Sequence, residues 1–137
     1  AELDRLRRAH DVVLIDSPPQ VATDARLAVR GADLVLVPMQ PSPPDLWAAE
    51  GTLKLAAGER RPARIVLNRT PAAGRLRAAV EAEIARQGFG MFAATLGNRT
   101  GFAQAFAAGL GITEALPRST AAAELRTLLA EIEEVLG

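Results

Sequence analysis

The sequence predicts an α/β fold, in which a parallel sheet is covered by separate layers of helices. Short aliphatic runs alternate with longer segments of helical periodicity, and this repetition implies right-handed crossovers between parallel strands. The runs are continuously apolar rather than alternating in polarity, as strands buried on both faces require. With 137 residues the chain fits one domain, residues 1–137, because two halves would each be short of core.

Four apolar runs are the expected strands. They lie at residues 12–15, 34–37, 65–67 and, more weakly, 91–96. Burial of each aliphatic side chain in such a run stabilises the fold by about 1.5–3 kcal/mol before chain entropy is subtracted. The first run leads directly into Asp16, which we place at the exit of that strand.

Four helices are expected between and after these strands. The one over residues 43–57 has Ser42 as its N-cap and contains Trp47, which we expect in the core. The others are expected at residues 21–30, 75–87 and 119–136. The last has leucines on one face and glutamates on the other. Because membrane-surface helices favour Lys and Arg on their polar face, we expect this helix to dock on the domain.

The composition excludes several classes of site. The chain has no cysteine, which excludes a disulfide scaffold, a thiolate-bound metal and a cysteine nucleophile. A single histidine, His10, excludes a multi-histidine metal centre and argues against a Ser-His-Asp triad. No apolar run approaches the ~18–20 residues of a membrane span, and 16 basic residues balance 16 acidic ones. We therefore expect a cytoplasmic protein without a membrane partner.

Polar residues follow the expected strands, and ligands of open parallel sheets bind beyond these carboxyl ends. Asp16 follows four aliphatic residues directly, so its carboxylate could hold Mg²⁺ through an oxygen or through a bound water. An aspartate at this place is also an ordinary cap of the following turn. For Asp16 taken alone, both interpretations stay open.

The second and third strand ends carry a proline-rich loop and an amide. Prolines fix the backbone of residues 38–44, as a loop that faces a ligand or a second protomer needs. Ser42 and Asp45 also fit a helix cap and its first-turn acid, which is the interpretation we favour for Asp45. Asn68 offers both a donor and an acceptor to the edge of a base, and it is equally an ordinary turn residue.

Taken together, these segments resemble the ParA/MinD group of P-loop ATPases, and most closely the small plasmid-type ParA partition proteins. Residues 11–19 (DVVLIDSPP) are similar to the Walker B stretch of that group. Residues 32–45 (ADLVLVPMQPSPPD) are similar to the strand and loop that follow it. Asn68, Arg69 and residues 99–105 match the group in order and spacing, so the resemblance covers nearly the whole chain.

The resemblance implies an ATPase that forms a homodimer with ATP and binds DNA without sequence preference. A ParB-like partner would stimulate hydrolysis, so that a cargo is positioned along the nucleoid, and the cofactors would be ATP and Mg²⁺. Asp16 would be the catalytic Walker B carboxylate that organises the metal. Asn68 and Arg69 would face the adenine, and Pro41 and Asp45 would lie near the nucleotide and the dimer seam.

The resemblance also implies two DNA contacts. Arg75 and Arg99 occupy places where members of the group carry basic residues that contact DNA phosphates. Arginine suits this role because its planar guanidinium meets phosphate oxygens in pairs. A solvated helix face is an equally good interpretation of both arginines.

The phosphate-binding part of the family pattern is missing. The sequence has no glycine-rich loop with a phosphate-binding lysine, and its single lysine, Lys54, falls inside an expected helix. The missing parts precede Walker B in the family, so we expect the sequence to begin partway through the domain. Strands 12–16 and 33–37 would then flank an empty slot with unpaired backbone groups. We expect that the 137-residue chain does not fold natively or hydrolyse ATP by itself.

Two other interpretations stay open. The chain could be a catalytically inactive, shortened ParA-like module that pairs with a full-length ATPase. It could also be an unrelated α/β domain, in which Asp16 and Asn68 are only turn residues.

Overall fold

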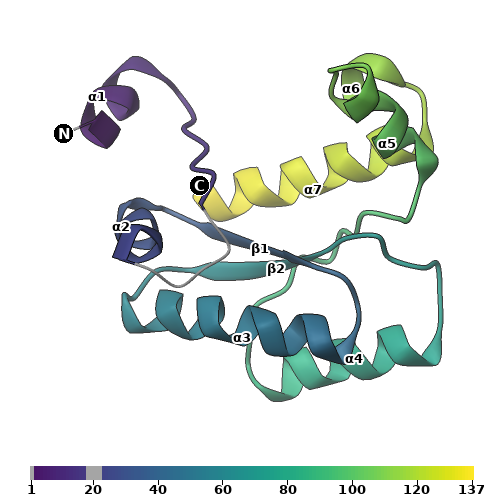
Figure 1. The fold of residues 1–137 in the computed structure, drawn as a ribbon, viewed down its shortest axis with the longest axis horizontal. Helices are drawn as coiled ribbons and strands as arrows, with labels where there is room; N and C mark the ends of the chain where they lie inside the picture. Colours follow the sequence, from purple (N-terminus) through teal and green to yellow (C-terminus); the bar gives the residue numbers. More distant parts are fainter. Residues whose placement is uncertain (1, 18–22) are drawn as a thin grey trace.

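The centre of the fold is a small parallel sheet, seen in a computed structural model that describes residues 2–17 and 23–137 (Figure 1). Strand β1 (Val35–Met39) pairs in parallel with β2 (Ala63–Leu67) over all five residues of each strand. Helix α3 (Pro43–Gly58) makes the crossover between them. The α/β class and the parallel direction of these two strands are therefore as the sequence predicts.

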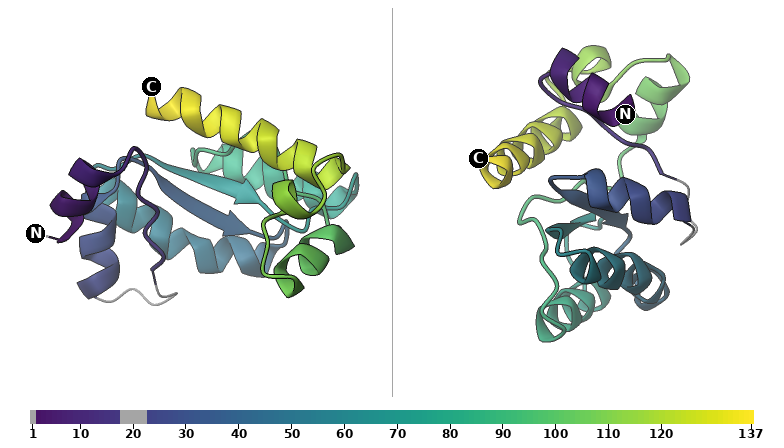
Figure 2. Two further views of the ribbon diagram at one scale, coloured as in Figure 1. Left: turned by 90° about the horizontal axis from the view of Figure 1, so that it is seen from above. Right: turned by 90° about the vertical axis from the view of Figure 1, so that its left-hand side faces the viewer.

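Helices lie on both faces of the sheet. α3 and α4 (Arg75–Arg86) pack on one face, and α7 (Thr120–Leu136) crosses the other (Figures 1 and 2). Because side chains alternate along a strand, β2 sends Ile65 and Leu67 toward α3 and α4, and Val66 toward α7. The two faces of one short sheet thus belong to two separate apolar clusters.

The expected helices at 43–57, 75–87 and 119–136 are confirmed as α3, α4 and α7. The helix expected at 21–30 is present as α2 (Thr23–Gly31), and residues 21 and 22 lie outside the described residues. Further helices that the sequence analysis did not place are α1 (Glu2–Ala9), α5 (Thr100–Ala107) and α6 (Ile112–Ala115). α5 and α6 pack with the start of α7 in a third apolar cluster.

Local sequence sets both ends of α3. Ser42 has an extended backbone, and its Oγ accepts a hydrogen bond from the backbone N–H of Asp45 at 3.3 Å. At the other end, the backbone N–H of Arg61 donates to the carbonyl of Ala56, as in a Schellman motif. Arg60 lies between them with a φ of 57°, a conformation that glycine adopts more easily.

Trp47 is not in the core, contrary to expectation. Its side chain is 68% exposed on the first turn of α3, because that helix turns Leu46, Ala49 and Leu53 toward the sheet instead. None of the helices formed by the described residues combines the length and the apolar character that crossing a membrane requires.

The fourth expected strand, at 91–96, is not a regular strand. Residues 90–97 follow the edge of β2 and form two isolated bridges, one with Ile65 of β2 and one with Thr70 beyond its end. The backbone N–H of Phe92 donates to the carbonyl of Ile65 at 3.0 Å, and that of Leu96 donates to Leu67 at 2.9 Å. Alanine and glycine have low strand propensity and interrupt the segment, which explains the irregular ladder.

The prediction of a strand at residues 12–15 is wrong. Residues 11–17 form no strand and make no backbone hydrogen bond to another described segment. Val12 and Leu14 are 75% and 84% exposed. A cavity of about 330 Å³ separates these residues from the edge of β1, and an apolar run that pairs with no neighbouring strand is not stable as a strand.

The edge of β1 that faces this cavity is open. The N–H of Val35 donates to Pro62, and the carbonyl of Met39 accepts from Asn68, so these two residues bond toward β2. By the alternation of a parallel ladder, the backbone groups of Leu36 and Pro38 face the opposite edge. Pro38 has no N–H, which leaves this edge poor in donors.

Candidate functional site

A cavity of about 430 Å³ opens at the carboxyl ends of β1 and β2. Its walls come from residues 40–42, which join β1 to α3, and from residues 69–77, which lead from β2 into α4. This is the edge at which parallel sheets bind ligands. Three of the predicted site residues, Pro41, Arg69 and Arg75, lie in its walls.

The loop after β1 is held by reciprocal hydrogen bonds with the start of α3. The Oδ2 of Asp45 accepts from the backbone N–H of Gln40 at 2.9 Å, while Ser42 caps the N–H of Asp45. Asp45 does not line the cavity in the described residues. Asp45 therefore holds this loop in place by its hydrogen bonds with Gln40 and Ser42, and Pro41 lies between these two residues.

The loop after β2 is fixed by Asn68 and Arg69. The Oδ1 of Asn68 accepts from the backbone N–H of Arg69 at 2.9 Å, and Arg69 has a φ of 49°. This bond occupies the amide oxygen and leaves the amide nitrogen of Asn68 to donate. Asn68 is half-buried beside the cavity walls rather than in them, whereas the side chain of Arg69 is exposed.

Arg77 lines the same cavity and was missed by the sequence analysis. Its Nη1 donates to the carbonyls of Pro71 and Ala72 at 2.8 and 3.2 Å, and its Nε pairs with Glu81 at 2.8 Å. These bonds tie α4 to the loop before it. The available signal for Arg77 in the sequence was its place two residues after Arg75, at the start of a helix.

Asp16 lies apart from this cavity. It is exposed in the segment 11–17 and is not among the described residues that line either cavity. No group of three His, Asp or Glu side chains that could hold a metal is found in residues 2–17 and 23–137. A lone carboxylate still fits Mg²⁺, which usually takes one or two carboxylates with waters and substrate phosphates.

Arg99 is engaged in a structural ion pair. Its Nε donates to Oε1 of Glu124 at 2.6 Å, and this carboxylate also accepts from the backbone N–H of Gly97 at 3.3 Å. The Glu124 carboxylate raises the pKa of Arg99 further above its ordinary value. Arg99 thus joins the start of α5 to α7, whereas Arg75 is exposed and makes no ion pair with another described residue.

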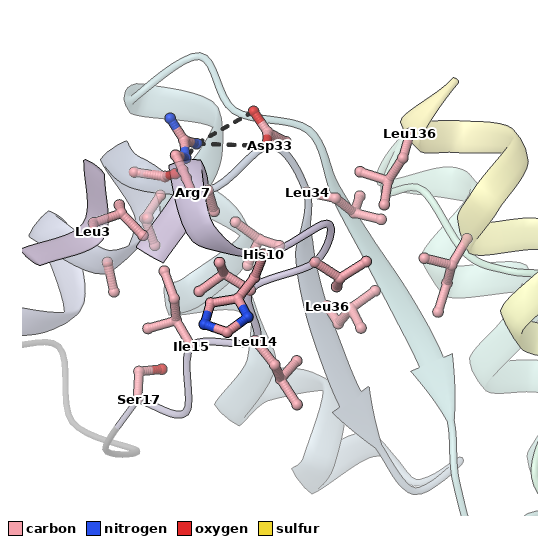
Figure 3. A pocket seen from close by; sticks show the side chains of 18 of the residues that line it. Leu3, Arg7, His10, Leu14, Ile15, Ser17, Asp33, Leu34, Leu36 and Leu136 are labelled. Atoms are coloured by element: carbon pink, nitrogen blue, oxygen red, sulfur yellow. Dashed lines mark hydrogen bonds and ion pairs between the residues drawn. The ribbon is translucent and has the colours of Figure 1, made fainter. Parts of the chain in front are cut away.

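A second cavity, of about 330 Å³, lies beside β1. Figure 3 shows Leu14 and Ile15 with Leu36 of β1 around it, and Arg7 at its rim bonded to Asp33. The walls are mostly aliphatic, and Leu136 of α7 contributes to them. The polar residues in the walls are Arg7, His10, Asp11, Ser17 and Asp33, of which Arg7 and Asp33 bond to each other.

No model of a known protein family matches the chain. The chain is similar to the maintenance of carboxysome distribution protein A of Halothiobacillus neapolitanus, with 29% identity over 131 residues. The alignment covers 90% of this chain and 60% of the relative, so the chain spans well under two thirds of the length of the protein it matches. This similarity supports the resemblance of the chain to a ParA-like family, and nothing finer.

Proposed function

We propose that the chain is part of a ParA-like positioning ATPase, which distributes a cargo inside the cell. In this proposal, the chain contains the edge of the sheet at which the nucleotide binds. The observation that carries the proposal is the cavity at the carboxyl ends of β1 and β2, with Pro41 and Arg69 in its walls. The similarity to a protein named for carboxysome distribution supports the same class. ATP and Mg²⁺ are the cofactors that we assign to the intact protein.

The residues around this edge have distinct proposed roles. Asn68 faces the base, to which its amide nitrogen can donate while its oxygen accepts from the backbone N–H of Arg69. Pro41 forms a rigid wall, and Asp45 keeps the backbone of that loop in place. Asp16 holds the metal, directly or through water. When bound, Mg²⁺ neutralises charge on the triphosphate.

The hydrolysis part of the proposal is tested at Asp16. We expect Asp16→Ala to abolish ATP hydrolysis by the intact protein, because the metal then loses its carboxylate. Asp11→Ala removes the same charge from the same exposed segment and should retain hydrolysis. An unchanged rate of phosphate release in Asp16→Ala would contradict the assignment of Asp16 as the carboxylate that holds the metal.

We further propose that the ATP-bound protein is a homodimer that binds DNA through Arg75 and Arg99, and that a ParB-like partner stimulates hydrolysis. If each protomer neutralises about two phosphates, the log–log salt slope of DNA affinity is roughly −3 to −4. Arg75 is exposed and ready for such a contact, whereas Arg99 must leave Glu124 to make one. We therefore expect Arg75→Ala to flatten the slope more than Arg99→Ala. A slope that neither change alters would remove both residues from the site.

A further inference from the structure

We propose that α1 is a detachable strap, which closes one end of the aliphatic cavity beside β1 and opens while the sheet stays folded. The strap is fastened at Gly31, the last residue of α2, by the side chains of Leu3 and Arg7. The inference goes beyond the proposed function, because it concerns the end of the sheet at which β1 begins and requires no nucleotide.

Helix α1 is held only at its surface. None of its eight residues is buried, and only Leu3 and Leu6 are half-buried. In water, isolated helices shorter than about 12–15 residues are marginal even with favourable sequences. Helix α1 is therefore helical because it is docked, and its release from Gly31 is also its local unfolding.

The first fastening is a close contact between Leu3 and Gly31. A Cβ atom at position 31 would lie 2.5 Å from Cδ2 of Leu3, which is too close for any side chain at both positions as they stand. The φ of Gly31 is not positive, so its backbone conformation does not require glycine. Glycine is needed at this position because Leu3 occupies the space that a side chain would take.

The second fastening is the guanidinium group of Arg7. Its Nη2 donates to the carbonyl of Gly31 at 2.6 Å and lies 3.5 Å from both carboxylate oxygens of Asp33. The last carbonyls of a helix have no partner within the helix, so Arg7 satisfies one of them at the negative end of α2. The side chains of Arg7 and Asp33 are 43% and 75% exposed, and an ion pair so exposed is weakened by salt.

The same two side chains of α1 form one end of the cavity. Leu3 and Arg7 line it together with aliphatic residues of β1 and of the segment 11–17, as Figure 3 shows for Leu14 and Leu36. Release of α1 removes this end wall. The strap therefore controls how far solvent reaches the aliphatic cavity and the open edge of β1.

Hydrogen exchange of the intact protein, read by mass spectrometry on peptides from α1, tests the first fastening. We expect Gly31→Ala to make exchange in α1 about tenfold faster, because the new methyl group displaces Leu3. Gly58→Ala is the matched control: Gly58 also ends a helix, α3, and a Cβ atom there meets nothing within 4 Å, so exchange in α1 should equal that of the parent. In a Leu3→Ala background, Gly31→Ala should add no further increase.

The second fastening is tested by Arg7→Gln, with Arg8→Gln as the control that removes the same charge from an exposed position of α1. We expect faster exchange in α1 for Arg7→Gln alone. Added sodium chloride should speed exchange in α1 of the parent and have less effect in Arg7→Gln, since the ion pair with Asp33 is then already lost. Amides of residues 64–66 should exchange at the parent rate in every variant, because the sheet stays folded.

The fluorescence of anilinonaphthalene sulfonate, a dye that binds exposed apolar surface, reports on the cavity. It should rise in Gly31→Ala and Arg7→Gln and stay at the parent value in Gly58→Ala and Arg8→Gln. The proposal is overturned if exchange in α1 is the same in all four variants, or if residues 64–66 lose protection together with α1. Faster exchange in α1 with unchanged dye fluorescence would overturn the claim that α1 closes the cavity.

Discussion

Two arginines have backbone conformations that favour glycine, and each lies two residues after the end of an element at an edge of the sheet. Arg60 (φ 57°) ends α3 at the amino edge, and Arg69 (φ 49°) follows β2 at the carboxyl edge. Arg69 is supported by a hydrogen bond from its N–H to the side chain of Asn68. Arg60 has only the backbone bonds of the helix end, so the strain at the two positions is compensated differently.

Glycine at position 60 should stabilise the protein. Arg60→Gly relieves the steric cost of the left-handed conformation, which outweighs the extra freedom of glycine in the unfolded chain, for a net gain of about 0.5–1 kcal/mol. Chemical denaturation with urea measures the change. Arg61→Gly removes the same charge next to it but has no positive φ to relieve, so it should not stabilise. Equal effects of the two changes would show that charge, not conformation, is responsible.

Glu83 makes stability depend on pH. Hydrogen bonds from Arg86 and Gln87 lower its pKa from 4.5 to about 2 in the folded state. A depressed folded pKa stabilises the folded state above pH 4.5, and this contribution is lost as the pH falls toward 2. The thermal midpoint should therefore fall as the pH is lowered through this range. The fall per pH unit should be smaller in Glu83→Gln than in the parent protein. An identical slope in both proteins would contradict the assignment.

At the scale of elements, two carboxylates of α7, Glu124 and Glu131, accept hydrogen bonds from the irregular segment 90–97 beside β2. Glu131 accepts from the backbone N–H groups of Ala93 and Ala94 at 3.0 and 2.5 Å. These bonds satisfy donors that a regular strand would have placed in a ladder. The helix thus replaces part of the pairing that residues 90–97 do not find in the sheet.

Glu131→Ala should destabilise the protein by about 1–3 kcal/mol, because it leaves backbone donors without a partner. Glu134→Ala is the control on the same helix, since that residue is exposed and has no such acceptor role in the described structure. Urea unfolding measures the free energy of unfolding of both variants. A loss of this free energy in Glu131→Ala that is no larger than in Glu134→Ala would contradict the role given to Glu131.

The elements that could be predicted are those whose signals are local. Ser42 and the following prolines define the start of α3, and the apolar periodicity defines α4 and α7. The strand expected at residues 12–15 could not be judged locally, because its formation depends on a partner edge that no local pattern reports. Pro41, Arg69 and Arg75 were singled out in the sequence for separate roles, and the structure brings them to one cavity, whereas the place of Arg77 and the hydrogen bond of Asn68 depend on how the loop closes.

At the scale of the whole molecule, the sheet is protected on one side and open on the other. Residues 90–97 cover the far edge of β2, whereas β1 faces an aliphatic cavity bordered by the exposed segment 11–17. A cavity of about 330 Å³ thus lies between these two segments, and only one of its two sides is a strand. An open apolar edge of this kind favours further pairing.

Hydrogen exchange should reflect this asymmetry. We expect strong protection for the amides of residues 64–66, because β2 bonds to β1 on one side and to residues 90–97 on the other, and exchange near the unfolded rate for residues 11–17. Mass spectrometry of peptides spanning the two segments measures both in one sample. Protection of residues 11–17 equal to that of β2 would contradict the open arrangement.

The central claim is that a nucleotide binds at the carboxyl ends of β1 and β2. The most direct measurement is a ¹H–¹⁵N correlation spectrum of the intact protein during titration with ATP and Mg²⁺. The account predicts saturable shifts of the amides at residues 40–42 and 68–77, with little change at the opposite edge around residues 59–62. Shifts confined to other surfaces, or a spectrum that ATP leaves unchanged, would contradict it.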